Sequence, residues 1–371
     1  MKIQCNREHL LQAFLSVASV APSRSPKPIL QHVKLEATHD GASLTATDLE
    51  IGIRHALAGV EVHAPGAVLL PVARFGGILR EGTDASFLIE ANPHATSVRG
   101  ERSHFELASA DPAEFPSHAE SDRNESFSVS PRVLRELIRR TIFATDNESS
   151  RYALGGVKLE FDDSLLTAVG TDGRRLARMS GPVGKIGAPT APTQNTIVPT
   201  KAMQLIERTI AASESEVLLD IKGSELLVRG EKASISARLL EGRYPDWRKV
   251  FPDSASRQRI DLAVGATLSA VRQAAIVTSE ESRGLEFTFG DGMLLLSGRA
   301  AEVGQSRVDL PIGYDGPAIA IMLDPRYVID FLKVLDPDKT CTIELKDSEA
   351  AAVFATDDGY GYVIMPLARE R

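Results

Sequence analysis

The side chains with the clearest chemical potential are arginines in a basic segment, SFSVSPRVLRELIRRTIFA, at residues 126–144. Ser130 and Pro131 are residues suited to cap and to begin a helix. The expected apolar stripe of that helix comprises Val133, Leu134, Leu137, Ile138 and Ile142. The arginines are left to the other faces, where their positive charge could contact phosphate groups.

Residues for catalysis or metal binding form no familiar pattern. The sequence has no GxxxxGK[ST], HExxH or GxSxG motif, and its eight histidines are scattered. Cys5 and Cys341 lie far apart, which argues against a disulfide framework or a cysteine-rich zinc site and fits a reducing cytoplasm. We expect no cofactor and no metal. An enzyme with Asp172, Arg174 and Arg175 as its site is an alternative, although it lacks a nucleophile–base pair.

The composition is that of an ordinary globular chain. At 371 residues there is room for two or three domains, and 43% hydrophobic with 25% charged residues is a typical balance. Aromatic residues are few, so we expect aliphatic cores. No apolar run approaches the roughly 18 residues typical of a membrane span. The net charge of −8 alone argues against a nucleic-acid partner, but it does not show where the charges lie.

One plan recurs three times along the chain. A strand followed by a helix is predicted at 1–20, 127–142 and 259–277, and a second helix at 72–81, 199–211 and 324–335. VRGERSHFEL and VRGEKASISA, which follow the second helix in the first two copies, align almost letter for letter. Polar stretches near Arg123 and Ser256 place the boundaries of three domains, at 1–124, 125–256 and 257–371. Chance similarity of common strand and helix patterns is the alternative, and the shared order argues against it.

The helices needed to position these cations share a charge bias. Basic residues outnumber acidic ones two to one in the six predicted helices, although the whole chain is acidic. If repeated domains present their helices on one surface, that surface is positive and could bind duplex phosphates without reading sequence. The alternative is that these are simply solvated helix faces.

Several blocks of the sequence resemble one family across essentially the whole chain. They are REHLL, PIL at 28–30, TATDLEI, FELASADPAEFP, RYALGGV, GTDGRRLA, EGRYPDWRKVFP and YVIMPL. Together they are similar to the bacterial DNA polymerase III beta subunit, the replication sliding clamp.

The resemblance implies an α+β fold of three repeated clamp domains, each with two helices packed on antiparallel sheets. It implies a head-to-tail ring dimer around double-stranded DNA and no catalytic activity. The implied partners are the DNA polymerase III alpha subunit, the clamp loader and other clamp-binding-motif proteins. The implied location is the cytoplasm, without a membrane.

The resemblance also implies a partner-peptide cleft between the second and third domains. Its walls would be Leu154, Thr171, Gly173, Arg174, Arg175, Leu176, Pro245, Val250, Val363, Ile364, Met365, Pro366 and Leu367. Pliable Met and buried apolar anchors suit such a role, and Asp172-Gly173 could turn the two arginines to the rim. Alternatively, TDG is a plain hairpin turn and VIMP a last core strand. Leu367 stands where the family usually has Met, and Ala368 follows, so the floor of the pocket can differ.

Two further sets of contacts follow from the resemblance. The implied DNA contacts are Arg24, Arg74, Arg151, Tyr152 and Lys201, with Ala153 where a second Tyr is common. The implied dimer contacts are Phe105 and Leu107 with Ile276 and Val277. The arginines could instead be solvated, and the four apolar residues could be core. A monomeric peptide-binding adaptor that never meets DNA is a further alternative, which the oligomeric state would separate.

Overall fold

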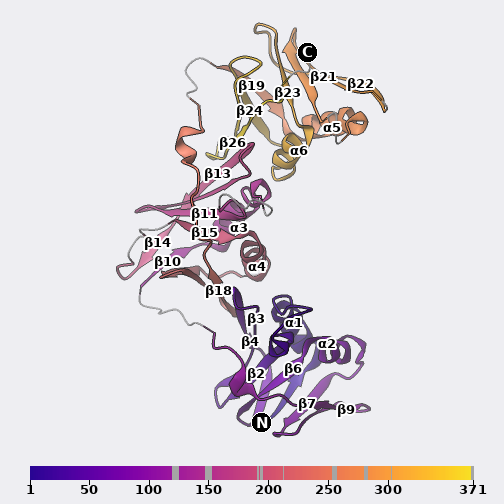
Figure 1. The fold of residues 1–371 in the computed structure, drawn as a ribbon, viewed down its shortest axis with the longest axis vertical. Coiled ribbons are helices and arrows are strands. Elements are labelled where there is room, and N and C mark those ends of the chain that lie inside the picture. The colour runs from indigo at the N-terminus through magenta and orange to yellow at the C-terminus, as the bar shows by residue number, and fades with distance from the viewer. Residues whose placement is uncertain are drawn as a thin grey trace. The chain divides into compact units, whose positions relative to one another are not determined.

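A computed structural model gives the fold (Figure 1), and the structure describes residues 1–118, 125–146, 153–189, 192, 195–211, 213–252, 257–279, 283–301 and 303–368. The chain divides into two compact units. Unit 1 comprises Met1–Pro131, Val183–Thr190 and Gln204–Leu239, and unit 2 comprises Arg132–Pro182, Ala191–Met203 and Leu240–Arg371. Each unit therefore combines segments from more than one third of the sequence.

Six α-helices form within the described residues, at the positions expected from the repeats. They are α1 (Arg7–Ala18), α2 (Val72–Glu81), α3 (Pro131–Arg139), α4 (Thr200–Ile210), α5 (Val264–Ala274) and α6 (Pro325–Lys333). Polar side chains cap two of them: Asn6 accepts from the first amides of α1, and Asp324 accepts from Arg326 N at the start of α6. Each helix is amphipathic, and α1 for example buries Leu10, Phe14 and Val17.

The basic helix α3 is shorter than its sequence pattern predicts. It ends at Arg139, and Ile142 lies in a separate 3₁₀ turn, Ile142–Ala144. Between them, the Thr141 hydroxyl donates to Leu137 O at 2.6 Å. Such back-bonding competes with the regular backbone pattern of a helix, so the expected stripe stops at Ile138.

Unit 1 contains a five-stranded sheet, in the order β5-β1-β7-β8-β9, and a nine-stranded sheet, in the order β14-β10-β16-β17-β18-β4-β3-β2-β6. The strands are β1 (Lys2–Asn6), β2 (His32–Thr38), β3 (Gly41–Thr47), β4 (Ile51–Leu57), β5 (Val60–Ala64), β6 (Gly66–Pro71), β7 (Ser86–Ala91), β8 (Ala95–Arg99), β9 (His104–Ala108), β10 (Ser126–Val129), β14 (Gly184–Ile186), β16 (Val217–Lys222), β17 (Glu225–Arg229) and β18 (Ala233–Arg238). The residues at 182–192, PVGKIGAPTAP, are rich in Pro and Gly, which favours a loop. Instead, Gly184–Ile186 pairs with β10, because an extended segment can satisfy the open edge of that strand.

Unit 2 contains an eight-stranded sheet, in the order β15-β11-β12-β13-β26-β25-β24-β19, and a four-stranded sheet, in the order β22-β21-β20-β23. The strands are β11 (Gly156–Phe161), β12 (Leu165–Thr171), β13 (Arg175–Pro182), β15 (Thr196–Pro199), β19 (Gln258–Ala263), β20 (Leu285–Gly290), β21 (Met293–Ala300), β22 (Gly304–Pro311), β23 (Ile319–Leu323), β24 (Thr340–Leu345), β25 (Ala352–Ala355) and β26 (Gly361–Ile364). The strand pairs of the described residues are antiparallel.

Two strand pairs join different thirds of the sequence into one sheet. In unit 1, β4 pairs with β18 from Ile51 opposite Ala237 to His55 opposite Ala233, and we call this pair the first seam. In unit 2, β13 pairs with β26 from Arg175 opposite Ile364 to Arg178 opposite Gly361, and we call this pair the second seam. Backbone hydrogen bonds therefore cross both joins, which makes each sheet continuous.

The cores differ from the aliphatic expectation in unit 2. In unit 1, most buried side chains are aliphatic, with one edge-to-face pair between Phe14 and Phe75. In unit 2, the Phe331 ring stacks on Tyr360 and Tyr362 at centroid distances of 5.3 and 5.2 Å, beside Phe354. The aliphatic prediction is wrong there, because few aromatic residues in the chain as a whole can still gather in one place.

Candidate functional site

The turn that joins β12 to β13 organises the expected cleft. Its backbone is held by side chains of its own: Thr171 Oγ1 donates to Arg175 O at 2.6 Å and accepts from Gly173 N at 3.1 Å. Asp172 Oδ1 accepts from the amides of Arg174 and Arg175 at 2.9 and 3.0 Å. Gly173 has a φ of +86°, a conformation that favours glycine. The turn is therefore rigid, and its geometry is encoded in T-D-G.

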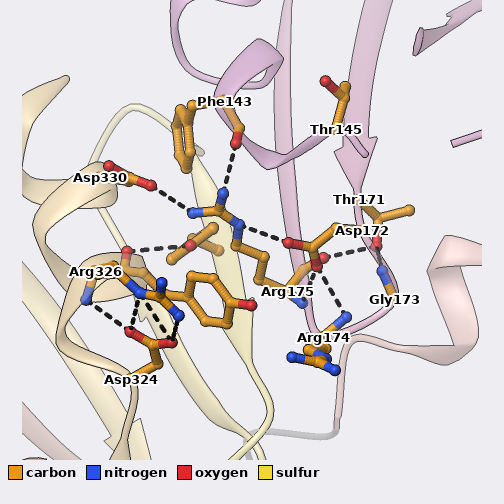
Figure 2. A network of polar contacts seen from close by, with 12 residues as sticks. Phe143, Thr145, Thr171, Asp172, Gly173, Arg174, Arg175, Asp324, Arg326 and Asp330 are labelled. Carbon is orange, nitrogen blue, oxygen red and sulfur yellow. Dashed lines mark hydrogen bonds and ion pairs between the residues drawn. The ribbon is translucent and has the colours of Figure 1, made fainter. Parts of the chain in front are cut away.

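Arg175 lies at the centre of a polar network (Figure 2). Its guanidinium donates to Asp172 at 3.0 Å, to Asp330 of α6 at 2.7 Å and to Phe143 O at 2.7 Å, and it stacks on the Tyr327 ring at 4.4 Å. Only 10% of the side chain is exposed. Burial alone would lower the pKa of this guanidinium, but the nearby Tyr362, Asp330 and Asp172 outweigh it and raise the pKa.

The two arginines of the turn have different surroundings. The sequence predicted that both lie at the rim, and this is wrong for Arg175, because its side chain points into the network of Figure 2. Arg174 is exposed, and its carbonyl accepts a hydrogen bond from Met365 N at 2.9 Å. Arg174 is therefore the cation that the turn offers to solvent, and Arg175 is a positioning residue.

The end of the chain continues from the second seam. Val363 and Ile364 are buried in β26, Met365 is 49% exposed, and Pro366 and Leu367 are half-buried. Leu367 N donates to Met322 O of β23 at 2.9 Å. The V-I-M-P segment therefore begins as a core strand and continues into Met365, which is exposed beside the turn.

The segment 244–251 covers one face of the eight-stranded sheet, although the sequence prediction used only Pro245 and Val250 from it. Tyr244 and Trp247 pack in a single buried cluster with Leu154, Leu176 and Ile197. The Tyr244 hydroxyl donates to Val169 O at 2.8 Å, which anchors the segment to β12. The signal was present in the block EGRYPDWRKVFP, whose aromatic residues could have been proposed as walls alongside Pro245 and Val250.

The structure brings most of the expected cleft residues together within unit 2. Leu154 and Leu176 share the buried cluster, Thr171–Arg175 form the turn, and the described C-terminal residues extend from the strand that pairs with β13. Pro245 is half-buried and Val250 is 37% exposed at the two ends of the Trp247 segment. An apolar surface with an exposed Met and Val beside a cationic turn is suited to binding a short apolar peptide.

The expected DNA contacts are only partly described. Arg24, Arg74 and Lys201 have exposed side chains, whereas Arg151 and Tyr152 lie outside the described residues. The basic helix residues are not equally available. Arg7 donates to Leu79 O and Asp84 O, and Arg139, Arg140 and Arg326 form ion pairs with carboxylates of their own unit. The exposed ones include Arg80, Arg132, Arg135, Arg208, Arg272 and Lys333.

The expected dimer contacts lie at two sheet edges. β9 is an edge strand of the five-stranded sheet, where Phe105 is 38% exposed and Leu107 is buried. β22 is an edge strand of the four-stranded sheet. It contacts the 3₁₀ turn Ala275–Val277, in which Ile276 is 77% exposed and Val277 half-buried. Open edges beside exposed apolar residues favour pairing with another chain.

The described residues show neither a metal-binding cluster nor a membrane-spanning helix. Among the described residues, no group of three or more His, Cys, Asp or Glu side chains could hold a metal ion. In the same part of the chain, no helix is both long and apolar enough to span a membrane.

Comparison with known proteins adds to this geometry. Three family models match consecutive segments: the N-terminal domain of the DNA polymerase III beta subunit at residues 1–119, its central domain at 128–246 and its C-terminal domain at 248–368. The beta sliding clamp of Chlamydia trachomatis serovar D is 30% identical over 368 residues, which cover 99% of this chain and 87% of the relative.

Two solved structures are also similar along the whole chain. The DnaN sliding clamp (DNA polymerase III subunit beta) from Pseudomonas aeruginosa bound to griselimycin is 26% identical, with a TM-score of 0.92 and complete coverage of both chains. The C. crescentus beta sliding clamp with bound PEG is 27% identical, with a TM-score of 0.89 over 100% of this chain and 99% of that one.

Proposed function

This chain belongs to the DNA polymerase III beta subunit family, the beta sliding clamps, and we propose how its own residues perform a clamp's work. A clamp is a processivity factor and not an enzyme: it tethers its partners to DNA by topology. The observation that supports this proposal most strongly is that the family match runs through all three domains in order. We place the domain boundaries at 1–124, 125–256 and 257–371, and the protein in the cytoplasm.

We propose that two copies close head to tail into a ring. The β9 edge of one copy meets the β22 edge of the other, with Phe105 and Leu107 packing on Ile276 and Val277. This arrangement removes both open edges and covers the most exposed large apolar side chain of the described residues, Ile276 at 77%. Because the contact is heterologous, two such joints are needed for closure.

The ring hypothesis is tested by light scattering. The expected mass is twice that of the 40.0 kDa chain. Ile276→Asp places a charge in the joint and should give the monomer mass. Leu165→Asp is the matched control, because Leu165 is 46% exposed but belongs to a hairpin outside the joint, and it should remain dimeric. A wild-type chain that stays monomeric at high concentration would refute the ring.

Double-stranded DNA is the proposed partner inside the ring, bound without sequence preference through Arg24, Arg74, Arg151, Tyr152 and Lys201. Such binding is weak and depends strongly on salt, because it rests on release of counterions. Arg24→Ala or Arg74→Ala should lower affinity evenly across sequences and reduce the salt slope by about 1. Lys346→Ala, an exposed change on the turn after β24, should change neither.

Topological tethering has its own test. Clamps loaded onto a nicked circle by the clamp loader should stay bound, and linearising the circle should release them. Equal release rates from circular and linear DNA would contradict tethering, even if the dimer and the DNA contacts are right.

The surface around the T-D-G turn is the proposed docking site for partner peptides. We expect it to bind the DNA polymerase III alpha subunit, the clamp loader and other clamp-binding-motif proteins through short apolar segments. Met365→Ala and Val250→Ala should weaken peptide binding about tenfold each by removing exposed apolar contacts, without a change in folding. Griselimycin, the ligand of the similar P. aeruginosa clamp, provides a competitor.

A further inference from the structure

Arg178 of β13 is a half-buried cation in apolar surroundings. Its guanidinium lies 5.8 Å from the centre of the Trp247 ring and 5.4 Å from that of Phe251. Nη2 donates to Gly359 O at 2.9 Å, and this is its one hydrogen bond to a described residue. Nε is buried and has no hydrogen-bond partner among the described residues. The group is thus held by contact with two rings and by one carbonyl, and its other donors have no partner in the described part of the chain.

Arg178 differs from its neighbours in lacking a carboxylate partner among the described residues. Arg140 pairs with Asp358, Arg175 with Asp330, and Arg248 with Glu160. Burial lowers the pKa of the Arg178 guanidinium. A cation that is partly desolvated and not neutralised is costly to a fold, and it attracts an anion from outside the chain more strongly than a solvated one does.

Arg178 lies next to the proposed docking surface. Alternate residues of a strand share a face, so Arg178 and Leu176 are neighbours on the side of β13 that Trp247 covers. The space for Phe251 depends on glycine, because a Cβ on Gly361 would lie 2.8 Å from Phe251 Cε1. The backbone beside β26 and the edge-to-face pair of Trp247 and Phe251 therefore hold the guanidinium at one end of the apolar cluster.

We propose that Arg178, which lies against both Trp247 and Phe251, binds a carboxylate of the partner peptide next to its apolar anchor. This inference rests on the proposed docking function of the surface, and it names the chemistry of the occupant: an apolar peptide with an acidic residue. The aromatic rings exclude water from the ion pair and pre-orient the guanidinium, so the contact discriminates a carboxylate from an amide of equal shape. Arg248 is unsuited to this role, because Glu160 already occupies it at 2.8 Å.

The test starts from a random peptide library displayed on phage and selected against the full-length protein, with elution by griselimycin. Acidic residues should be enriched over amides at one position beside the apolar anchors. A synthetic lead peptide should bind about tenfold more tightly than its Glu→Gln or Asp→Asn analogue, because a hydrogen bond between charged groups is strong.

Three variants assign that preference to a residue. Arg178→Gln should bind the acidic and the amide peptides equally, and Arg178→Lys should keep part of the preference. Arg248→Gln is the matched control, since Arg248 stacks on the same Trp247 ring at 4.3 Å, and it should keep the full preference. Unchanged affinity of Arg178→Gln for the amide peptide shows that the surface is still folded.

The outcomes separate this inference from the proposed function. If peptides are selected and displaced by griselimycin but show no acid preference, or if Arg178→Gln keeps the preference, the Arg178 assignment is refuted and the docking surface stands. If griselimycin displaces no selected peptide, the docking surface itself is refuted, and the role of Arg178 with it.

Discussion

The first and second seams follow the same backbone plan, each beside a hairpin turn that begins with Thr-Asp. In the first, Thr47 Oγ1 donates to Ile51 O at 2.9 Å and accepts from Leu49 N at 2.9 Å, and Asp48 Oδ1 accepts from the amides of Glu50 and Ile51. These are the hydrogen bonds of Thr171 and Asp172 in the second turn. The backbone hydrogen bond beside each turn is also repeated: Arg238 N donates to Glu50 O, and Met365 N donates to Arg174 O.

The side chains on this shared plan differ at several matched positions. Arg175 of the second seam corresponds to the buried Ile51, and Leu176 corresponds to Gly52. Trp247 matches His118, because each stands two residues after the proline of an aromatic-Pro pair, Tyr244-Pro245 and Phe115-Pro116.

The matched position of Trp247 shows the contrast most clearly. His118 Nε2 is 3.1 Å from Ser234 Oγ and lies over Gly52. The first seam is thus closed by a small polar cluster, whereas the second presents an apolar surface with exposed Val250 and Met365. The lesson is that the repeat supplies the framework, and a few side chains decide whether it becomes a docking site.

The largest effect should come from Arg175, because the matched residue of the first seam, Ile51, carries no charge. Arg175→Met would leave Asp172 and Asp330 without their cation and should lower the free energy of unfolding by about 3 kcal/mol. Denaturant unfolding followed by the fluorescence of Trp247, the single Trp, reports on unit 2 directly. Arg174→Met is the control and should stay within about 0.5 kcal/mol. A loss for Arg175→Met below about 1 kcal/mol would mean that the network adds little.

The next effect concerns the closed first seam. A Cβ on Gly52 would lie 2.7 Å from Ser236 Oγ and 3.0 Å from His118 Nδ1, so Gly52→Ala should destabilise unit 1 by about 1–2 kcal/mol through overpacking. His118→Ala or Ser236→Ala should recover part of that loss in the double variant, as amide exchange of β4 and β18 would show. Gly77→Ala in α2, with open space around it, is the control and should not destabilise.

Additive losses in the double variants would contradict the steric account. They would mean that Gly52 is needed for its backbone alone, and that His118 does not occupy the space above it.

A smaller effect tests whether the two turns are equivalent. Gly173→Leu copies the first turn, in which Leu49 has a φ of +79°, and it should cost about 1 kcal/mol through backbone strain with no clash. Leu49→Gly relieves that strain but raises the conformational entropy of the unfolded chain. The two effects oppose each other, so the free energy of unfolding should change by less than about 0.5 kcal/mol. Unfolding midpoints check both values, and a large loss in Leu49→Gly would show that the exposed Leu49 side chain has packing partners.

The smallest effect is in the response to acid. Burial and Lys232 lower the pKa of His55, against the hydrogen bond to Ala56 O that raises it. The locally unfolded state then binds the proton more readily than the folded state does. The strand pairing of the first seam should therefore become less stable as pH falls below about 6.5. Burial would raise the pKa of Asp358, but hydrogen bonds from Thr356 and Arg140 outweigh it and lower the pKa. The second seam should therefore hold until pH falls below about 4.

The measurement is amide exchange at several pH values, corrected for the intrinsic rates, in β4 and β18 against β13 and β26. His55→Gln should remove the step near neutral pH from the first seam and leave the second unchanged. If both seams loosen together, His55 does not control the first one.

Several elements were predictable from the sequence because their causes are local. Helix positions followed from apolar spacing and capping residues, and α2 matches its expected bounds, Val72–Glu81. Asp172-Gly173 was identified as a turn from residue type, and the side chains of Thr171 and Asp172 indeed bond to the backbone of the turn. The premature end of α3 and the strand Gly184–Ile186 were missed, since a threonine hydroxyl and a partner edge decided them.

The sequence by itself determined the three-fold repeat, the family and the T-D-G turn, because each depends on the local pattern and order of residues. Only the tertiary structure decided that Arg175 is buried while Arg174 faces solvent, and that Arg178 lies against Trp247 and Phe251 without a carboxylate partner among the described residues. The physical reason is that the environment of a charge also depends on groups far away along the chain, such as Asp330 for Arg175 and Trp247 for Arg178. Pattern along one strand shows which side chains share a face, but not what covers that face.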